Sequence, residues 1–77
     1  MFNAREVNVI CHALGWPKCY RNRFFATNGS QNYDTWTGLV IKGHAEVIDP
    51  DLKITGFALN AGGLSAFKKF MLEKVSQ

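Results

Sequence analysis

The chain has 77 residues, a hydrophobic fraction of 47%, a charged fraction of 19% and a net charge of +3, which together indicate one globular domain, residues 1–77, with a single small core. It holds no apolar run of the roughly 18 residues that a membrane helix needs. Two cysteines are too few for a disulfide scaffold and no export segment follows Met1, so we expect a cytoplasmic protein.

The first predicted element is a helix over residues 4–14. Asn3 and Glu6 have the spacing of a capping box at its start, and Gly15 is placed to end it. Its apolar residues recur at i, i+3, i+4 and i+7 and are expected on one buried face: Val7, Ile10, Cys11 and Leu14.

Residues 17–29 show no decisive periodicity. The run from Lys18 to Phe25 interleaves cations with aromatic rings and fits a helical turn, a short strand or a loop. The sequence does not decide among these three structures. Asn28-Gly29-Ser30 predicts a turn after it.

A second helix is predicted from Ser30 to Lys42. Ser30 or Asn32 can accept hydrogen bonds from the free amides at its start, and Gly43 fits the left-handed position after its end. Its buried stripe is expected to contain Tyr33, Trp36, Leu39 and Val40.

A hairpin and a last helix complete the chain. Residues 44–48 and 53–59 alternate enough for two strands, and the Asp-Pro-Asp sequence at 49–51 predicts the turn between them. Asn60 is placed to cap the last helix. The expected core consists of Val7, Ile10, Leu14, Trp36, Leu39, Val40, Val47, Phe57, Leu59, Leu64, Phe67 and Met71.

Two stretches carry a resemblance to a known family. Residues 36–47, WTGLVIKGHAEV, and residues 54–64, ITGFALNAGGL, resemble the second half of winged-helix transcription regulators, where a helix ends in a Leu-Val-x-x-Gly-Leu type turn before the wing. A Leu-Thr-x-x-Gly pattern then opens the closing helix, and Asn60 stands here in place of that Thr. The chain is also similar to small bacteriophage proteins that share a His-Ala-Leu-Gly start and a Tyr-Arg-Asn-Arg-Phe centre.

The resemblance implies an α+β, winged-helix-like fold. Helices would pack with a two-stranded antiparallel hairpin, the wing, in the order helix, irregular segment, helix, strand, strand, helix. A full winged helix has three helices ahead of the wing, so the middle one would have to be a truncated turn within residues 18–25. The implied role is that of a small phage-type accessory or regulatory protein that binds DNA.

Charge and residue type locate the expected nucleic-acid contacts. The helix over residues 30–42 is a poor reader of the major groove, because Asp34 and the acidic turn at 49–51 oppose phosphate. The basic aromatic run is the better candidate, since interleaved cations and rings grip a backbone and stack bases; a solvated loop whose rings belong to the core is the competing interpretation. The expected binding residues are Lys18, Tyr20, Arg21, Arg23, Lys42, Lys68 and Lys69.

An interaction with a host or phage protein is the alternative function. The aromatic residues exceed what one small core needs, and rings with arginine are typical of interface hot spots. Trp16, Tyr20 and Phe25 are the expected partner-binding residues. The placement of charge separates the two functions: residues 1–29 and 53–77 each carry a net +3 and residues 30–52 carry −3. Grouping of the basic residues away from the acidic ones favours nucleic acid, and intermixing favours a protein partner.

Metal binding and catalysis are not expected. The metal-ligand candidates Cys11, His12, Cys19 and His44 lack the paired spacing of two to five residues. The six carboxylates are scattered, and Gly62-Gly63 lacks the lysine of a phosphate loop. We therefore predict a non-enzymatic protein with no cofactor.

Overall fold

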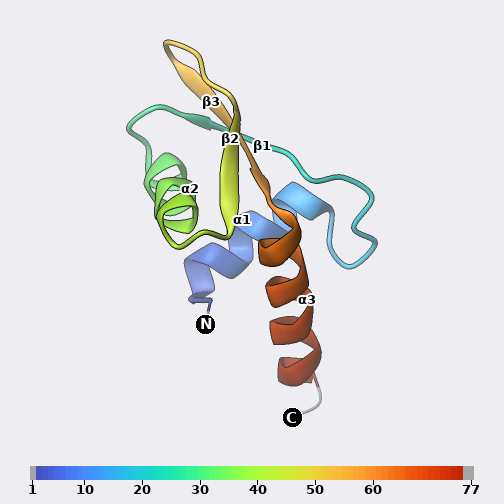
Figure 1. Cartoon of the computed structure of the whole chain (residues 1–77). Helices are drawn as coiled ribbons and strands as arrows, with labels where there is room; N and C mark the ends of the chain where they lie inside the picture. Colours follow the sequence, from blue (N-terminus) through green and yellow to red (C-terminus); the bar gives the residue numbers. More distant parts are fainter. Residues whose placement is uncertain (1, 76–77) are drawn as a thin grey trace.

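The described part of the chain forms three helices and one three-stranded antiparallel sheet (Figure 1). This computed structural model describes residues 2–75. The elements are α1 (Ala4–Leu14), β1 (Phe24–Thr27), α2 (Gln31–Ile41), β2 (Ala45–Asp49), β3 (Ile54–Leu59) and α3 (Ala61–Val75).

The predicted start and end of α1 are confirmed. The Asn3 side chain accepts the backbone N–H of Glu6 at 2.8 Å, and the Glu6 carboxylate accepts the backbone N–H of Asn3 at 2.9 Å. Gly15 ends the helix with a left-handed φ of 70°. The buried face is wider than predicted, because α1 packs against both α2 and β1; its buried residues are Glu6, Val9, Ile10, Ala13 and Leu14.

The predicted capping residues of α2 are also confirmed. Of the two caps left open, Ser30 is the one used, and its hydroxyl accepts the Tyr33 N–H at 3.2 Å. Gly43 has a φ of 84° and donates to the Val40 carbonyl, while His44 donates to the Leu39 carbonyl, both at 3.0 Å. These two bonds form the Schellman motif that closes a helix with glycine.

The predicted hairpin is confirmed, but the sheet has a third strand. β1 lies in the segment whose structure the sequence left open, and it pairs antiparallel with β3, so that the strand order is β1-β3-β2. The two-stranded hairpin expected from the sequence is therefore only part of the sheet. No helix lies between α1 and α2 in the described chain, so the truncated middle helix that a full winged helix would require within residues 18–25 is not formed.

One face of the sheet carries the core. Antiparallel partners share a face, and the register aligns Phe24 and Val47 with Phe57, whose ring stacks on that of Trp36 at 5.8 Å. The Trp36 side chain is fully buried, and its indole N–H has no hydrogen-bond partner among the described residues. Val47 was expected in the core and is 47% exposed, because β2 is an edge strand and its residues after Ala45 are exposed.

The rest of the predicted core is largely confirmed. Ile10, Leu14, Trp36, Leu39, Phe57, Leu59 and Phe67 are buried, and Val7, Val40, Leu64 and Met71 are half-buried against them. The sequence missed Phe2, Val9, Ala13, Ala26, Ala45 and Ala58. Four of these six are alanines, whose small side chains give a weak hydrophobic signal.

A β-bulge interrupts the outer strand of the hairpin. The pairing of β2 with β3 shifts register between Val47 and Asp49, so that the residue between them has no partner opposite it. Bulges bend and twist the strand that carries them. The β2 edge is therefore irregular where the hairpin approaches its turn.

Helix α3 follows β3 with only Asn60 between them. Asn60 caps it as predicted, accepting the Gly63 N–H at 2.6 Å, and its amide also donates to the Gly43 carbonyl at 2.7 Å. Phe67 anchors the helix between two rings, 5.5 Å from Phe2 and 5.4 Å from Trp16. Figure 1 shows α3 running away from the hairpin, which makes the molecule 42 Å long.

Candidate functional site

Residues 15–23 wrap the C-terminal end of α1. They overlap the basic aromatic run of the sequence, residues 18–25, and are named here the basic aromatic segment. The last four carbonyls of a helix have no partner inside it, and here this segment supplies partners for all four. Cys11 accepts from the Gly15 and Trp16 N–H groups, His12 from the Arg21 side chain, Ala13 from the Arg23 N–H and Leu14 from the Arg21 N–H. The segment is thus a fixed part of the fold.

Asn22 fastens the same segment to the sheet. Its side-chain amide donates to the Leu59 carbonyl at 2.8 Å, and its side-chain oxygen accepts the Leu59 N–H at 3.0 Å. The backbone of a strand paired with β3 would make the same two bonds to Leu59, one to its carbonyl and one to its N–H. The segment therefore enters β1 already aligned with β3.

Arg21 and Tyr20 form one exposed unit. The Arg21 guanidinium donates to the His12 carbonyl at 2.7 and 3.1 Å and lies 5.2 Å from the centre of the Tyr20 ring. Tyr20 is 69% exposed, and its ring rests against Gly15, where a Cβ atom would collide with it. A guanidinium over an accessible ring is suited to contact a phosphate or a planar group of a ligand.

Lys18 and Lys68 come together although fifty positions separate them. They line one hollow of about 260 Å³ between the basic aromatic segment and α3, named here the Lys18–Lys68 hollow. Its remaining walls are mainly apolar and consist of Trp16, Pro17, Cys19 and Leu72. This contact between the first and last thirds of the chain unites their positive charge.

Trp16 also borders a second hollow. This one, named the Arg21 hollow, has a volume of about 300 Å³ and is lined by Asn8, Cys11, His12, Gly15, Trp16 and Arg21. The half-buried Trp16 thus lines both hollows, one together with Arg21 and the other together with the two lysines. The three cations lie on two adjoining hollows.

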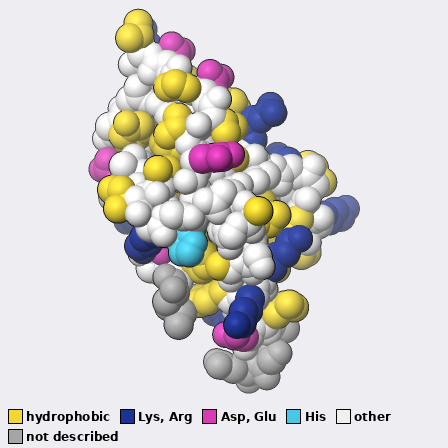
Figure 2. Space-filling model, viewed as in Figure 1, with side chains coloured by type: hydrophobic (Ala, Val, Ile, Leu, Met, Phe, Trp, Pro, Cys, Tyr) yellow, Lys and Arg dark blue, Asp and Glu magenta, His cyan; other side chains and the backbone are white. Residues whose placement is uncertain are grey.

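Charge is separated across the molecule. Figure 2 shows Lys and Arg side chains mainly on the flank and lower part, where the basic aromatic segment and α3 lie in Figure 1. Asp and Glu side chains gather toward the hairpin in the upper part of that view, and others lie at its left edge and beside α3. The pattern of charge along the sequence therefore persists in space, although it is not absolute.

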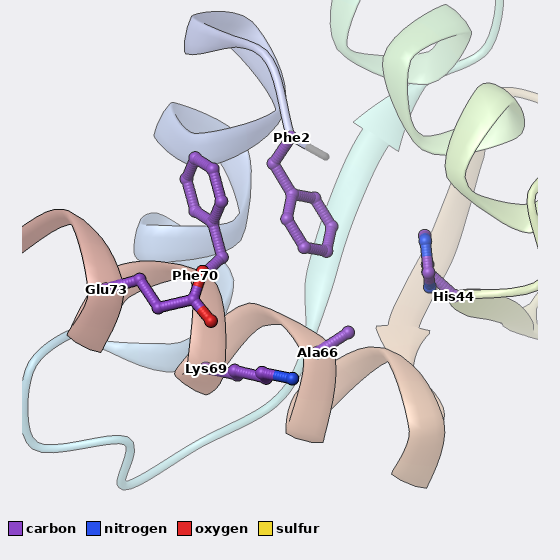
Figure 3. Close-up of a pocket in the computed structure, with 6 residues that line it drawn as sticks. All are labelled: Phe2, His44, Ala66, Lys69, Phe70 and Glu73. Atoms are coloured by element: carbon purple, nitrogen blue, oxygen red, sulfur yellow. The ribbon is translucent and has the colours of Figure 1, made fainter.

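Two predicted binding lysines lie elsewhere. Lys42 pairs with the buried carboxylate of Glu6 at 2.8 Å, while its own side chain is 49% exposed. Lys69 lies on another flank of α3, in a hollow of about 250 Å³ with Phe2, His44, Ala66, Phe70 and Glu73. Figure 3 shows the Phe2 ring between Phe70 and His44 in that hollow, with Lys69 and Glu73 reaching it from α3.

The Glu6 carboxyl is held in its charged form. Burial works to raise its pKa, but hydrogen bonds from Lys42 and from the Asn3 backbone, together with the positive charge of Lys42, outweigh burial and lower the pKa below its ordinary value. The side chain is only 4% exposed. Lys42 thus compensates a buried charge, which explains why it serves the fold.

The remaining predicted residues are dispersed. Arg23 is exposed beside the start of β1, and Phe25 is 51% exposed on the sheet face opposite the core, where its ring covers Gly56. Trp16, Tyr20 and Phe25 therefore do not form one partner-binding cluster: Trp16 and Tyr20 belong to the basic aromatic segment and Phe25 to the sheet.

The sequence missed a polar hollow between the starts of α1 and α2. It has a volume of about 420 Å³ and is lined by Ala4, Arg5, Asn8, Gln31 and Asn32. Arg5 and Asn8 could not be assigned beside Gln31 and Asn32 from the sequence, because this requires the packing of the two helices. This α1–α2 hollow is the main competitor for a polar ligand.

The cysteines and histidines form no metal centre among the described residues. No group of three or more His, Cys, Asp or Glu side chains lies close enough to hold an ion in residues 2–75. Cys11 and Cys19 are free and half-buried. Burial raises the pKa of the Cys11 thiol and the neighbouring Cys19 adds to the rise, which disfavours the thiolate needed for a nucleophile.

Within the described part of the chain, no helix is long and apolar enough to cross a membrane. Comparison of the chain with known protein families, with curated proteins and with solved structures gives no match.

Proposed function

We propose that this chain is a small phage-type accessory or regulatory protein that binds nucleic acid on its basic face, formed by residues 15–23 and α3. The single observation that carries the proposal is the meeting of Lys18 and Lys68 in one hollow beside the Trp16 ring. Cations next to an aromatic wall are the combination that grips a phosphate backbone and its bases. The acidic hairpin at the other end explains why binding would be confined to this face.

The arrangement of elements supports a winged-helix-like reading in reduced form. The order helix, strand, helix, hairpin, helix agrees with it, and so does β1 at the sheet edge against β3. No helix stands between α1 and α2 in the described chain, so a helix-turn-helix unit for the major groove is incomplete. We therefore assign binding to the basic face and not to α2.

Salt dependence tests the proposal. Binding of a mixed-sequence duplex and of its separated strand should weaken steeply between 50 and 200 mM salt, at roughly 0.7–0.9 log units per log unit of salt for each phosphate neutralised. Replacing Lys18 and Lys68 by Gln should lower the salt slope by about one for each lysine. Binding measured by fluorescence anisotropy over a salt series would show both effects.

Two variants with the same loss of charge serve as controls. Lys53→Gln removes an exposed cation from the hairpin turn and should leave the slope unchanged. Arg5→Gln removes the cation of the α1–α2 hollow, and a larger loss there than at Lys18 and Lys68 would move the interface to α2. Absence of any binding at 50 mM salt would refute the proposal.

A protein partner is the second candidate, favoured by the open face of the sheet. Phe25, Ile48 and Ile54 are 51%, 40% and 46% exposed, and Figure 2 shows hydrophobic side chains among acidic ones over the sheet. Such a surface fits a partner with an apolar centre and basic rim. Phe25→Ser should abolish retention of this partner from nuclease-treated bacterial lysate, whereas Lys18→Gln should not.

A further inference from the structure

We infer that the nucleic acid bound by the basic face is single-stranded, with one unstacked base inserted against Trp16 in the Lys18–Lys68 hollow. This inference rests on the proposed function and adds the form of the ligand. It depends on three features of the site: the shape of the hollow, the position of the cations around it, and the arrangement of the two hollows that Trp16 borders.

The Lys18–Lys68 hollow suits a base better than a phosphate. Its volume of about 260 Å³ lies just under the range of about 300–1,000 Å³ typical of small-molecule pockets. The indole of Trp16, the Pro17 ring and Leu72 supply apolar wall. A base in a duplex is paired and stacked and cannot enter such a hollow, whereas a base in a single strand is free to do so.

Trp16 is held in place before any ligand arrives. Its indole meets the Phe67 ring at 5.4 Å and nearly at right angles, 84°, and Phe67 is fully buried. The backbone N–H of Trp16 donates to the Cys11 carbonyl at the end of α1, which fixes the main chain from which the ring projects. A ring already packed against a buried neighbour loses less conformational freedom when a base stacks on it, so stacking contributes more to affinity.

The cations lie where the phosphates of such a strand would run. Lys18 comes from the basic aromatic segment and Lys68 from α3, so the two lysines reach the hollow from different elements. Arg21 lines the adjoining Arg21 hollow, which Trp16 also borders, and lies beside the exposed Tyr20 ring. A strand crossing Trp16 would meet a cation before and after the stacked base, which matches a backbone track with interleaved rings.

Tryptophan fluorescence gives a direct test in the unmodified protein. The chain has two tryptophans; Trp36 is fully buried and Trp16 borders both hollows. Titration with oligothymidine at 100 mM salt should quench about half of the emission and leave the Trp36 part unchanged. An abasic oligodeoxynucleotide of equal length, which keeps the phosphates, should bind at least about tenfold more weakly and quench little.

Affinity for the two forms of DNA supplies the second measurement. The single strand should bind at least about tenfold more tightly than the duplex of the same sequence at 100 mM salt. Trp16→Leu should lower single-strand affinity about tenfold and change duplex affinity less than twofold, while Trp16→Phe should keep most of it. Oligouridine titrated in parallel separates RNA from DNA as the source of the strand.

The outcomes are distinguishable. Equal or tighter binding of duplex, or single-strand binding without Trp16 quenching, would overturn this inference and leave the proposed function standing. Absence of binding to every nucleic acid would overturn both. Should Trp16→Leu fail to fold, as seen by circular dichroism, the quenching and the abasic comparison in the unmodified protein still decide the question.

Discussion

Among the described residues, the buried charge of this domain comes from a single residue, Glu6. It is paired with Lys42 across 36 positions of sequence, so the packing of α1 against the end of α2 depends on this ion pair. A buried charge left without its partner costs much more than an exposed one. Lys42 should therefore affect stability more than its surface position indicates.

Acid should weaken the protein through Glu6. Its pKa is lowered on folding, so the carboxylate stabilises the fold above its ordinary pKa of 4.5, and this contribution disappears as pH falls through the lowered value. The free energy of unfolding from urea titrations should drop more steeply between pH 5 and 3 for the unmodified protein than for Glu6→Gln. Parallel curves would contradict this reading.

The partner lysine can be tested at neutral pH. Lys42→Met leaves the Glu6 carboxylate buried without a cation and should lower the free energy of unfolding by about 2 kcal/mol. Lys53→Met, on an exposed residue of the hairpin turn, removes the same charge and should change it by under about 0.5 kcal/mol. Equal effects in urea denaturation would mean that Lys42 acts only through net charge.

Adjacent glycines at the start of α3 should respond in opposite directions. A Cβ atom on Gly63 would collide with the backbone carbonyl of His44, whereas one on Gly62 would only touch the Asn60 side chain at 3.5 Å. Gly63→Ala should destabilise by about 1–3 kcal/mol, and Gly62→Ala should be neutral or stabilise by up to about 1 kcal/mol. Thermal melts of both variants would show it, and a harmless Gly63→Ala would disprove the close approach.

At the scale of elements, the irregular segment between α1 and β1 joins the domain together. Its backbone N–H groups donate to carbonyls at the end of α1. The Asn22 side chain bonds to β3, and the Trp16 ring packs against Phe67 of α3. A segment without regular structure therefore fixes three regular elements.

Asn22 should be the most sensitive polar residue of that segment. Asn22→Ala removes both bonds to Leu59 and leaves backbone groups near the buried end of β3 unpaired, so the free energy of unfolding should fall by about 1–3 kcal/mol. Asn32→Ala, at an exposed amide of α2, is the matched control and should change it little. Loss of equal size in both variants, measured by urea denaturation, would refute the role of Asn22.

What could be predicted from the sequence was local. Asn3, Gly15, Ser30, Gly43 and Asn60 act within a few residues of themselves, so the sequence was enough to predict both ends of α1 and α2 and the start of α3. A strand at β1 was left open among three structures, because its four residues are too few for a period and its pairing with β3 lies about thirty residues away.

The candidate site needed tertiary information for the same reason. The approach of Lys18 to Lys68 depends on how α3 packs against Trp16. The pairing of Lys42 with Glu6 depends on the contact of α1 with α2. Neither contact can be read from the residues near it in sequence. The sequence therefore named Lys42 without its pairing to Glu6, and named Lys18 and Lys68 without placing them in one hollow.

At the scale of the whole molecule, length and charge act together. The domain is 42 Å long, with the acidic hairpin near one end and α3 at the other (Figure 1). The Debye length is about 8 Å at physiological salt and about 30 Å at 0.01 M. The two ends should therefore sense each other's charge only at low salt.

This separation predicts how hairpin variants affect nucleic-acid binding. Asp49→Asn combined with Asp51→Asn should change affinity less than about twofold at 0.15 M salt and should raise it more clearly at 0.01 M. The reason is that the hairpin turn and α3 lie toward opposite ends of a molecule 42 Å long. Anisotropy titrations at both salts, beside Lys18→Gln with Lys68→Gln, provide the comparison. A large gain at both salts would show that the hairpin itself touches the ligand.

The bulge in β2 has a consequence for behaviour at high concentration. An outer strand with a regular row of amide and carbonyl groups is a template on which another copy can extend the sheet, and repeated extension leads to fibrils. The register shift between Val47 and Asp49 breaks that row, and the acidic side chains along β2 repel a second acidic edge. The protein can thus leave apolar residues exposed on its sheet and still resist fibril growth along β2.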